Sequence, residues 1–281
     1  MKEKVSICIP VYNAENTIVD TLYSAINQTY KNIEILIIDN CSEDNTVSII
    51  KNIEDDRIVF FQNDTNIGMT ANWNECIKKS TGEYIHFLCA DDYIDPECIE
   101  KKIAAFNRDE EIVLVTSARD VVDDNNVVIH KRQFYNKNVI VEGKKFAKKS
   151  LFIGNIFGEP SCVMFKKRVL KKTGNFSDNL CYTTDWELWI RIASTGKIAY
   201  LSRSLTKFRI SVSSITSSIR LGRVLEDDKN MINNLIDNNT VKISCGDYFI
   251  HRAVLTVRDV IRLFFVKTIK MKGILNKIAD R

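Results

Sequence analysis

The sequence predicts an α/β fold in which a mostly parallel, Rossmann-like sheet is flanked by helices. Short apolar runs alternate with helix-like segments in the first hundred residues, at 5–11, 33–38, 58–61 and 84–89. These runs are continuously apolar, which is typical of parallel strands covered on both faces. In such sheets, ligands bind beyond the carboxyl ends of the strands. Functional side chains are therefore expected at those ends.

Helical spacing of apolar residues accounts for the segments between these strands. It predicts helices at 18–26, at 47–53 after a Ser42 cap, and at 69–80. Farther along, the patterns predict a helix at 96–107, a strand at 112–116, a hairpin turn at 123–126 and a helix at 185–194.

The last third of the chain differs in pattern from the rest. The Ser/Thr-rich stretch 211–218 is expected to be mobile, and the chain is expected to be helical beyond about residue 220. We therefore divide the chain into halves 1–100 and 101–219 of one domain and a helical C-terminal segment, 220–281.

Composition excludes several classes of protein. Of the 281 residues, 45% are hydrophobic and 27% charged, as in globular domains, and a net charge of +4 is too mild to indicate nucleic-acid binding. The eight cysteines form no C-x-x-C pair, so free thiols and a cytoplasmic location are expected, with no zinc site. The first residues lack the h-region and cleavage site typical of a signal peptide, so none is expected, and no run is long enough to span a bilayer.

Polar residues follow each of the four predicted strands. The pairs are Tyr12-Asn13, Asp39-Asn40, Asn63-Asp64 and Asp91-Asp92. Because the strands are parallel, these pairs should converge on one edge of the sheet.

Asp91 and Asp92 form the most informative of these pairs. Adjacent carboxylates repel each other unless a cation or strong donors neutralise them, and Mg²⁺ or Mn²⁺ bound to a diphosphate is such a cation. The alternative is a solvated turn that caps the helix starting near Pro96.

Asp39 could accept hydrogen bonds from a nucleobase or ribose, and Tyr12, after the rigid exit at Pro10, could stack on a base. The alternative for Asp39 is structural, with Ser42 and Asp44 capping the next helix. No G-x-G-x-x-G or G-x-x-x-x-G-K-[ST] motif occurs, which removes the main support for dinucleotide-binding and P-loop proteins.

Asp185 opens an amphipathic helix in the middle of the chain. It could be a helix cap, or a general base that takes a proton from an acceptor hydroxyl, with Glu187 as the second candidate. His86, His130 and His251 have no spacing typical of a metal site or triad, and His86 is expected to be packed in a strand.

Taken in order, these motifs resemble the glycosyltransferase family 2 domain, whose members have the GT-A fold and mostly transfer sugars with inversion. The matching stretches are 5–15, 24–34, 37–46, 66–68, 82–85 and 90–92, with weaker matches at 158–161, 174–176 and 184–185. The resemblance therefore covers nearly all of residues 5–96.

The resemblance implies a nucleotide-binding half at 1–100 and an acceptor-binding half at 101–219. It implies a nucleotide-sugar donor, with a UDP-sugar as first expectation, a saccharide or lipid-linked saccharide acceptor, and Mn²⁺ or Mg²⁺ as cofactor. Asp185 would be the base, Asp91 the first choice of metal ligand and Asp92 the second. The residues expected to contact the donor are Pro10, Tyr12, Asn13, Asp39, Asn74, Asp91 and Arg209, with Trp73 as a further candidate.

Two positions depart from the family pattern. Cys89 replaces the first acidic residue of the family's Asp-x-Asp, which puts the expected ribose contact in doubt. Ser211 stands where many relatives carry a histidine, so a histidine contact to the metal or diphosphate is not expected, and Arg209 remains for the diphosphate charge. These departures keep a non-catalytic binding protein open as an alternative, beside a nucleotidyltransferase.

The C-terminal stretch 252–281 contains eight Lys or Arg and two Asp among apolar residues. Such a basic amphipathic helix could lie on the inner face of the plasma membrane, where lipid-linked acceptors occur. The alternative is a helix packed on the domain with a solvated basic face. The range of the family points to surface polysaccharide or lipopolysaccharide synthesis.

Overall fold

The computed structural model describes residues 3–210, 221–244, 246–254 and 256–257. Within them, ten strands form one sheet in the order β3-β2-β1-β4-β9-β6-β10-β5, with β7 on β6 and β8 on β10. The strands are β1 (Val5–Val11), β2 (Ile33–Asp39), β3 (Ile58–Gln62), β4 (Tyr84–Phe87), β5 (Tyr93–Ile94), β6 (Ile112–Val122), β7 (Val128–Arg132), β8 (Val139–Glu142), β9 (Met164–Lys166) and β10 (Lys197–Arg209).

The helices cover both faces of this sheet. They are α1 (Ile18–Ile26), α2 (Thr46–Lys51), α3 (Met69–Lys79), α4 (Cys98–Phe106), α5 (Gly143–Ile153), α6 (Leu170–Thr173), α7 (Thr184–Ala193) and α9 (Leu221–Asp237), and residues 246–254 are also helical. Short 3-10 turns, η1 (Pro160–Cys162) and η2 (Lys167–Val169), flank β9. Among the described residues, no helix combines the length and apolar character needed to cross a bilayer.

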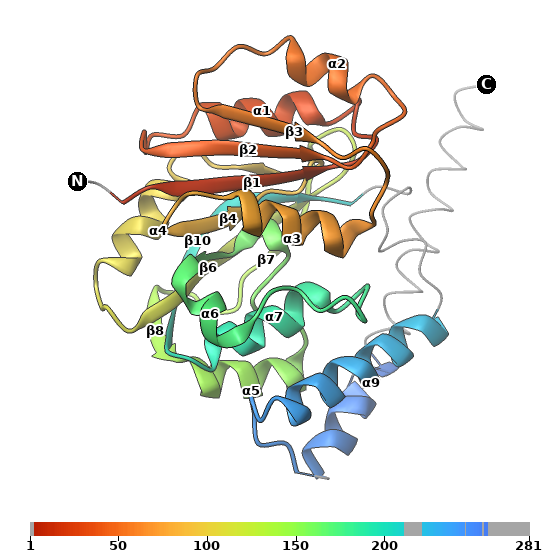
Figure 1. The fold of residues 1–281 in the computed structure, drawn as a ribbon. Coiled ribbons are helices and arrows are strands. Elements are labelled where there is room, and N and C mark those ends of the chain that lie inside the picture. The colour runs from red at the N-terminus through yellow and green to blue at the C-terminus, as the bar shows by residue number, and fades with distance from the viewer. Residues whose placement is uncertain (1–2, 211–220, 245, 255, 258–281) are drawn as a thin grey trace, which may run out of the picture.

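Two apolar cores lie on opposite faces of the sheet. Side chains of α1, α2 and α4 pack with one set of strand residues, including Ile7 and Ile35. Side chains of α3, α5, α7 and α9 pack with the alternate set, including Cys8 and Leu36. Figure 1 shows this division, with α1 and α2 on one side of the sheet and α3, α5 and α7 on the other. The continuous apolar runs in the sequence therefore reflect burial on both faces, as predicted.

Parallel pairing is confined to part of the sheet. Strands β1, β2, β3 and β4 are parallel, and β6 is parallel to β10. By contrast, β9 lies between β4 and β6 and is antiparallel to both. The predicted α/β sheet flanked by helices is confirmed, and the antiparallel insertion is a feature that the sequence pattern did not predict.

Strand register brings the predicted chemical groups to one edge. Val11 pairs with Asp39, and Asp39 pairs with Gln62, so β1, β2 and β3 end in line. Leu88 continues this alignment through a hydrogen bond from its N–H to the Cys8 carbonyl, 2.9 Å long. Residues after these four strands therefore lie at the same edge of the sheet.

Several local predictions are confirmed and one is wrong. The helices predicted at 18–26, 69–80 and 185–194 lie within one residue of those bounds, and β6 and β7 form the predicted hairpin. The Ser42 cap is wrong: the helix starts at Thr46 with Asn45 as N-cap, because Ser42 instead joins the loops after β1 and β2.

The C-terminal prediction is tested only in part. Residues 221–237 and 246–254 are helical, as predicted. The expected mobile stretch 211–218 and most of the basic stretch, from 258 onward, lie outside the described residues. The seven cysteines in the described part of the chain are free thiols.

Candidate active site

The acidic pair follows β4 directly. The Cys89 sulfur and one carboxylate oxygen each of Asp91 and Asp92 all lie within 4.8 Å of one another. Three potential ligand atoms are therefore gathered at the edge where ligands of parallel sheets bind. Two carboxylates offer the hard oxygen donors that Mg²⁺ and Mn²⁺ prefer, so this residue set fits such an ion.

Asp92 is held by donors that come from distant parts of the chain. The Ser161 hydroxyl donates to Oδ2 at 2.5 Å, and the Arg209 N–H donates to Oδ1 at 3.0 Å. Ser161 Oγ in turn accepts a hydrogen bond from the Cys89 N–H at 3.0 Å. Ser161 thus fixes both the carboxylate and the backbone of the turn. Because Asp92 is engaged on both oxygens, Asp91 is the freer of the two carboxylates for a cation.

Desolvation dominates the electrostatics of this cluster. Burial raises the pKa of Asp92 well above its ordinary value, and the neighbouring Asp91 raises it further. Burial also raises the pKa of Asp91, although Arg209 opposes this effect. The Cys89 pKa is raised well above its usual value by burial and by both carboxylates. A divalent cation would relieve this repulsion, which supports the fit between these residues and a metal.

Arg209 is the cation beside the pair. Its side chain is almost fully buried, and its Nε donates to the Asp91 carbonyl at 2.9 Å. Another nitrogen donates to the Asp124 carbonyl in the β6–β7 turn at 3.2 Å, and Nη2 lies 3.6 Å from the Asp20 carboxylate of α1. Arg209 therefore joins three separate segments around the acidic pair and brings a positive charge to it.

The predicted nucleotide side is built from the loops after β1 and β2. Both Asp39 oxygens accept hydrogen bonds from Ser42, one from its N–H at 3.0 Å and one from its hydroxyl at 2.5 Å. Ser42 Oγ accepts from the Asn13 N–H at 2.9 Å, and Asn13 Oδ1 accepts from the Glu43 N–H. Asp39 therefore has a clear structural role in shaping this loop.

Tyr12 and Pro10 occupy the same strand ends. Pro10 is paired with Ile38 in the sheet, and the Tyr12 side chain is 45% exposed, which leaves its ring accessible to a base. Asn13 adopts a φ of 48°, so the chain turns sharply after the tyrosine. These residues lie at the carboxyl edge above Asp39, which is itself fully buried.

A cluster of hydrogen-bonded asparagines lies at the end of β3, and the sequence did not predict these bonds. Asn63 donates to the side chains of Asn40 and Asn72, at 3.0 Å each, and Asn40 donates to Asn66. Asn72 then donates to the Ile38 carbonyl. The only sequence signal for this cluster was the polar character of each strand end.

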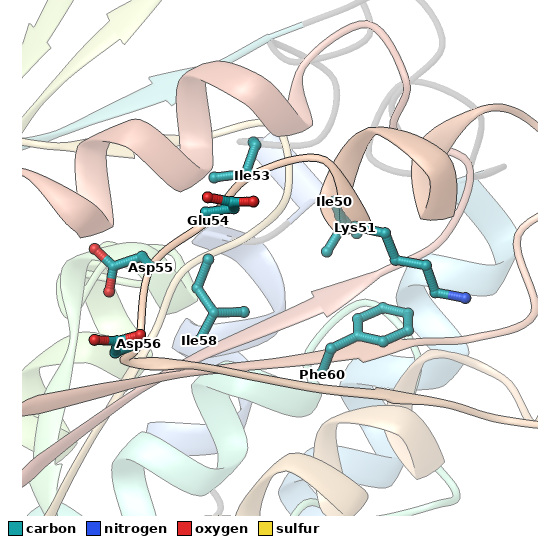
Figure 2. A pocket seen from close by; sticks show the side chains of 8 residues that line it. All are labelled: Ile50, Lys51, Ile53, Glu54, Asp55, Asp56, Ile58 and Phe60. Atoms are coloured by element: carbon teal, nitrogen blue, oxygen red, sulfur yellow. The ribbon is translucent and has the colours of Figure 1, made fainter.

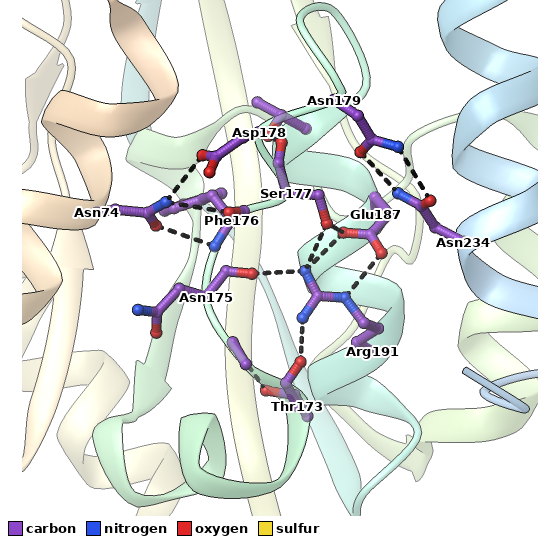
Figure 3. A network of polar contacts seen from close by, with 12 residues as sticks. Asn74, Thr173, Asn175, Phe176, Ser177, Asp178, Asn179, Glu187, Arg191 and Asn234 are labelled. Carbon is purple, nitrogen blue, oxygen red and sulfur yellow. Dashed lines mark hydrogen bonds and ion pairs between the residues drawn. The ribbon is translucent and has the colours of Figure 1, made fainter. Parts of the chain in front are cut away.

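Asn74 does not belong to this asparagine cluster. Its side-chain Nδ2 donates to the backbone carbonyl of Phe176, and its side-chain Oδ1 accepts from the Phe176 N–H, both at 3.0 Å (Figure 3). Asn74 is two positions farther along α3 than Asn72 and is committed to the segment before α7. The structure thus gives Asn74 a structural partner, and its predicted donor contact stays a prediction.

Asp185 lies in the first turn of α7. Burial raises its pKa to about 7, with a further contribution from Glu159, whereas the backbone at Trp186 and the Arg119 charge act in the opposite direction. Its Oδ2 lies 3.4 Å from the Asn155 amide. The N-cap position of α7 is Thr183, and Asp185, in the first turn, accepts a hydrogen bond from the Trp186 backbone, so a capping role for Asp185 stays open beside the catalytic one. A carboxylate with this pKa can accept a proton near neutral pH.

Asp185 and the acidic pair share one environment. The Asp185 charge contributes to the raised pKa of Cys89, and Glu159 contributes to the raised pKa values of both Asp185 and Asp92. Glu159 lies in the 158–161 stretch that also supplies Ser161. The loop 155–161 contacts both the candidate base and a candidate metal ligand, because the Asn155 amide lies 3.4 Å from Asp185 and the Ser161 hydroxyl donates to Asp92.

The two ion pairs of Glu159 were not predicted from the sequence. Arg119 and Arg132, partners in the β6–β7 ladder, both pair with Glu159, Arg132 at 2.8 Å. Burial acts to raise the Glu159 pKa, but the two arginines hold it below its ordinary value. Glu159 therefore stays ionised and keeps the Asp185 pKa high.

Glu187 and His86 have structural roles. Glu187 is fully buried and pairs with Arg191 at 2.6 Å, so it is unsuited to take a proton from an acceptor. His86 is fully buried in β4, as predicted, with Nδ1 3.0 Å from the Val163 carbonyl.

Pockets at the opposite edge of the sheet lack this chemistry. One of about 390 Å³ lies between the end of α2 and the start of β3 (Figure 2). Lys51, Glu54, Asp55 and Asp56 line it together with apolar side chains, and none of the candidate site residues contributes to it. A larger groove, about 920 Å³, borders the starts of β1 and β4, and Asn74 is the one candidate site residue that lines it.

Known proteins resemble this chain over most of its length. An uncharacterized glycosyltransferase of Rickettsia typhi is 31% identical over 76% of this chain, and the match spans 66% of that protein's length. An uncharacterized glycosyltransferase of Methanocaldococcus jannaschii is also 31% identical, over 74% of this chain and 71% of that protein.

Solved structures share the fold. S. aureus TarS residues 1–349 in complex with UDP-GlcNAc gives a TM-score of 0.72 at 19% identity, over 90% of this chain and 71% of that chain. The mannosyltransferase PcManGT of Pyrobaculum calidifontis, in complex with GDP-Man and Mn²⁺, gives 0.62 at 14% identity, over 90% and 70%. The fold of this chain is thus the GT-A type.

A family assignment follows from sequence over most of the sheet. The profile described as Glycosyl transferase family 2 matches residues 6–174, a span that holds the four parallel strands, the acidic pair and Ser161. With strand ends, acidic pair and fold in agreement, the chain belongs to glycosyl transferase family 2.

Proposed function

We propose that this protein transfers a sugar from a nucleotide-sugar donor to a hydroxyl group of an acceptor by a metal-dependent, inverting displacement. The observation that carries the proposal is a buried carboxylate, Asp185, that the loop 155–161 connects to the desolvated pair Asp91 and Asp92. An acid pair alone fits many proteins. An acid pair with a nearby carboxylate whose pKa is about 7 fits proton abstraction next to a bound diphosphate.

Each residue has a role in this reaction. Asp91 and Asp92 hold Mn²⁺ or Mg²⁺, which when bound supplies Lewis-acid stabilisation of the departing nucleoside diphosphate. Asp185 takes the proton from the acceptor hydroxyl as its oxygen attacks C1 from the face opposite the leaving group, which inverts that carbon. Arg209 adds positive charge beside the diphosphate. Pro10, Tyr12, Asn13 and Asp39 border the nucleotide.

The donor proposed first is a UDP-sugar, in line with the UDP-GlcNAc complex of TarS. A screen of UDP-, GDP- and TDP-sugars with Mn²⁺, in which water serves as acceptor, tests the proposal through release of the nucleoside diphosphate. We expect release from one donor class and loss of that release in EDTA. Equal turnover in EDTA would contradict metal dependence.

The same screen separates the alternatives. A nucleotidyltransferase would release pyrophosphate from a nucleoside triphosphate and leave nucleotide sugars intact. A non-catalytic binding protein would turn over neither, and calorimetry with UDP and Mn²⁺ would show whether it binds them.

The acceptor side of the proposal places the reaction at the inner face of the plasma membrane, in surface polysaccharide or lipopolysaccharide synthesis. Support comes from the helix at 246–254, where Phe249 and Ile250 are 72% and 54% exposed next to Arg252. Apolar side chains beside basic ones suit an anionic bilayer surface. Flotation with anionic and neutral liposomes tests this. Binding that persists after deletion of 252–281 would contradict a role for that stretch.

A further inference from the structure

The loop before α7 is held from several directions. This segment, residues 173–183, connects α6 to the helix that carries Asp185. Figure 3 shows its first part bound to neighbouring helices. Arg191 of α7 donates to the carbonyls of Thr173 and Asn175, and Ser177 donates to Glu187 at 3.1 Å. The start of the loop is therefore fixed from within α7 itself.

The end of the loop is fixed by a single carboxylate of α9. Asp227 Oδ1 accepts the Cys181 N–H at 2.7 Å, and Oδ2 accepts the N–H groups of Tyr182 and Thr183 at 2.9 and 2.7 Å. The Thr183 hydroxyl also donates to Oδ2, at 2.8 Å. Asp227 is only 8% exposed, so these bonds form out of water. Four donors on one carboxylate define the path of residues 181–183.

These bonds act on the start of α7. Thr183 is the N-cap of this helix, and its side chain makes no capping hydrogen bond of its own. The Thr183 hydroxyl instead donates a hydrogen bond to Asp227, whose negative charge lies at the positive end of the α7 dipole. Asp227 therefore organises the helix start from another helix. Asp185 is two residues beyond the N-cap.

A second pair of residues ties the same loop to α9. The side-chain amides of Asn234 and Asn179 pair with each other: Asn234 Nδ2 donates to Asn179 Oδ1 at 3.1 Å, and Asn179 Nδ2 donates to Asn234 Oδ1 at 3.2 Å (Figure 3). Helix α9 is also anchored by the buried side chains Met231, Ile232 and Leu235. This helix lies outside the 6–174 span that the family profile matches.

We propose that α9 positions the catalytic base, with Asp227 as a positioning residue that fixes the first turn of α7. This inference rests on the proposed function, because it assigns Asp185 the role of base. A base must lie within hydrogen-bond reach of the proton that it takes, and a displacement of about 1 Å can cost about 10²-fold in rate. Without the carboxylate, residues 181–183 lose four hydrogen bonds and Asp185 loses its fixed position.

Hydrogen exchange tests the contact without any substrate. The Asp227→Asn variant keeps the size of the side chain but replaces one of its two acceptor oxygens by an NH₂ donor, so at least one of the N–H groups of residues 181–183 loses its acceptor. We expect these amides to exchange at least about tenfold faster, with the interior of α7 unchanged. The matched control is Glu226→Gln, which removes an exposed charge one position away on the same helix. Unchanged exchange at 181–183 would overturn the proposal.

A double-mutant cycle tests the link to the base. Donor hydrolysis is measured across the nucleotide-sugar panel for Asp185→Asn, Asp227→Asn and the double variant, together with the affinity for UDP and Mn²⁺. We expect Asp227→Asn to lower the rate about 10²-fold with unchanged UDP affinity, and to have no further effect in the Asp185→Asn background. Multiplied losses in the double variant would show that Asp227 acts independently of the base.

The outcomes distinguish the two proposals. If Asp185→Asn leaves the rate unchanged, the assignment of the base fails. If Asp185→Asn removes activity but Asp227→Asn does not slow it, only the role of α9 fails. Should Asp227→Asn not fold, Asn234→Ala repeats both measurements at a partly exposed position. In that variant, unchanged exchange at 179–183 together with an unchanged rate overturns the proposal.

Discussion

The donor side and the acceptor side of the site are built by different means. On the donor side, the contacts join loops that follow adjacent parallel strands: Asp39 binds Ser42, three residues away, and Asn13 binds Ser42 of the next strand end. The acceptor half instead meets the donor half through long-range contacts: Ser161 and Arg209 of the acceptor half bind Asp92, 69 and 117 residues away. Strand register thus suffices to form one side, whereas the other needs elements that come late in the chain.

This difference predicts how substitutions will act. Changes on the donor side should weaken nucleotide binding locally and leave the fold intact. Changes at the junction of the two sides should lower the affinity for the metal, the affinity for the nucleotide and the free energy of unfolding together. The largest effect is expected where both sides meet, at Asp91 and Asp92.

Replacement of Asp91 by Asn should have the largest effect on activity. It removes the carboxylate that is free of the Ser161 and Arg209 hydrogen bonds, and with it the ligand that we expect to bind the cation first. Loss of metal stabilisation should lower donor turnover by at least about 10³-fold, equivalent to about 4 kcal/mol. EDTA should have the same effect on the wild-type protein.

The control is Asp64→Asn, which removes an exposed carboxylate after β3, at the edge of the sheet. We expect normal turnover in that variant. Full activity of Asp91→Asn with saturating Mn²⁺ would move the metal to other ligands.

Replacement of Asp185 by Asn should lower turnover by about 10² to 10⁴-fold while UDP affinity is kept. The pH dependence follows from its pKa of about 7, raised by burial. A base acts only when deprotonated, so wild-type turnover should rise with pH and level off above about pH 7. That rise should be absent from the residual activity of the variant. Asp178→Asn, an exposed change in the loop before α7, is the control and should keep the wild-type profile.

Replacement of Ser161 by Ala tests the junction between the two sides. It leaves the Cys89 N–H and one oxygen of Asp92 without their partner, both in a buried environment. The cost should be about 1 to 3 kcal/mol in the free energy of unfolding, measured by urea denaturation. The affinity for Mn²⁺ with UDP should fall as well.

Ser117 provides a matched control for this substitution. It is a fully buried serine of β6 whose hydroxyl makes no hydrogen bond within the described residues. Ser117→Ala should therefore cost little, and an equal loss of stability in both variants would argue against a specific role for the Ser161 bridge.

The same contrast explains how much the sequence could predict. The apolar runs and the strand-end rule located Asp39 and the acidic pair, because strand register alone brings them to one edge. The Ser161 and Arg209 bonds to Asp92 could not be predicted, since they depend on how the second half of the sheet packs against the first. The role of Asp227 was hidden for the same reason. The predicted Ser42 cap was wrong because the Ser42 hydroxyl accepts a hydrogen bond from the Asn13 N–H and not from the start of α2.

Replacement of Tyr12 by Ala should have the smallest effect, confined to the donor side. The ring is 45% exposed at the end of β1, where a base could stack on it. Loss of one stacking contact should weaken UDP binding by about tenfold, roughly 1.4 kcal/mol, and leave the free energy of unfolding unchanged, as measured by calorimetry and urea denaturation. Tyr23→Ala removes a similarly exposed tyrosine, 50% accessible on α1, and should leave UDP affinity unchanged. If Tyr12→Ala instead destabilised the fold as much as Ser161→Ala, the donor-side loops would depend on the rest of the site as strongly as the acceptor side does, and the contrast between the two sides would not hold.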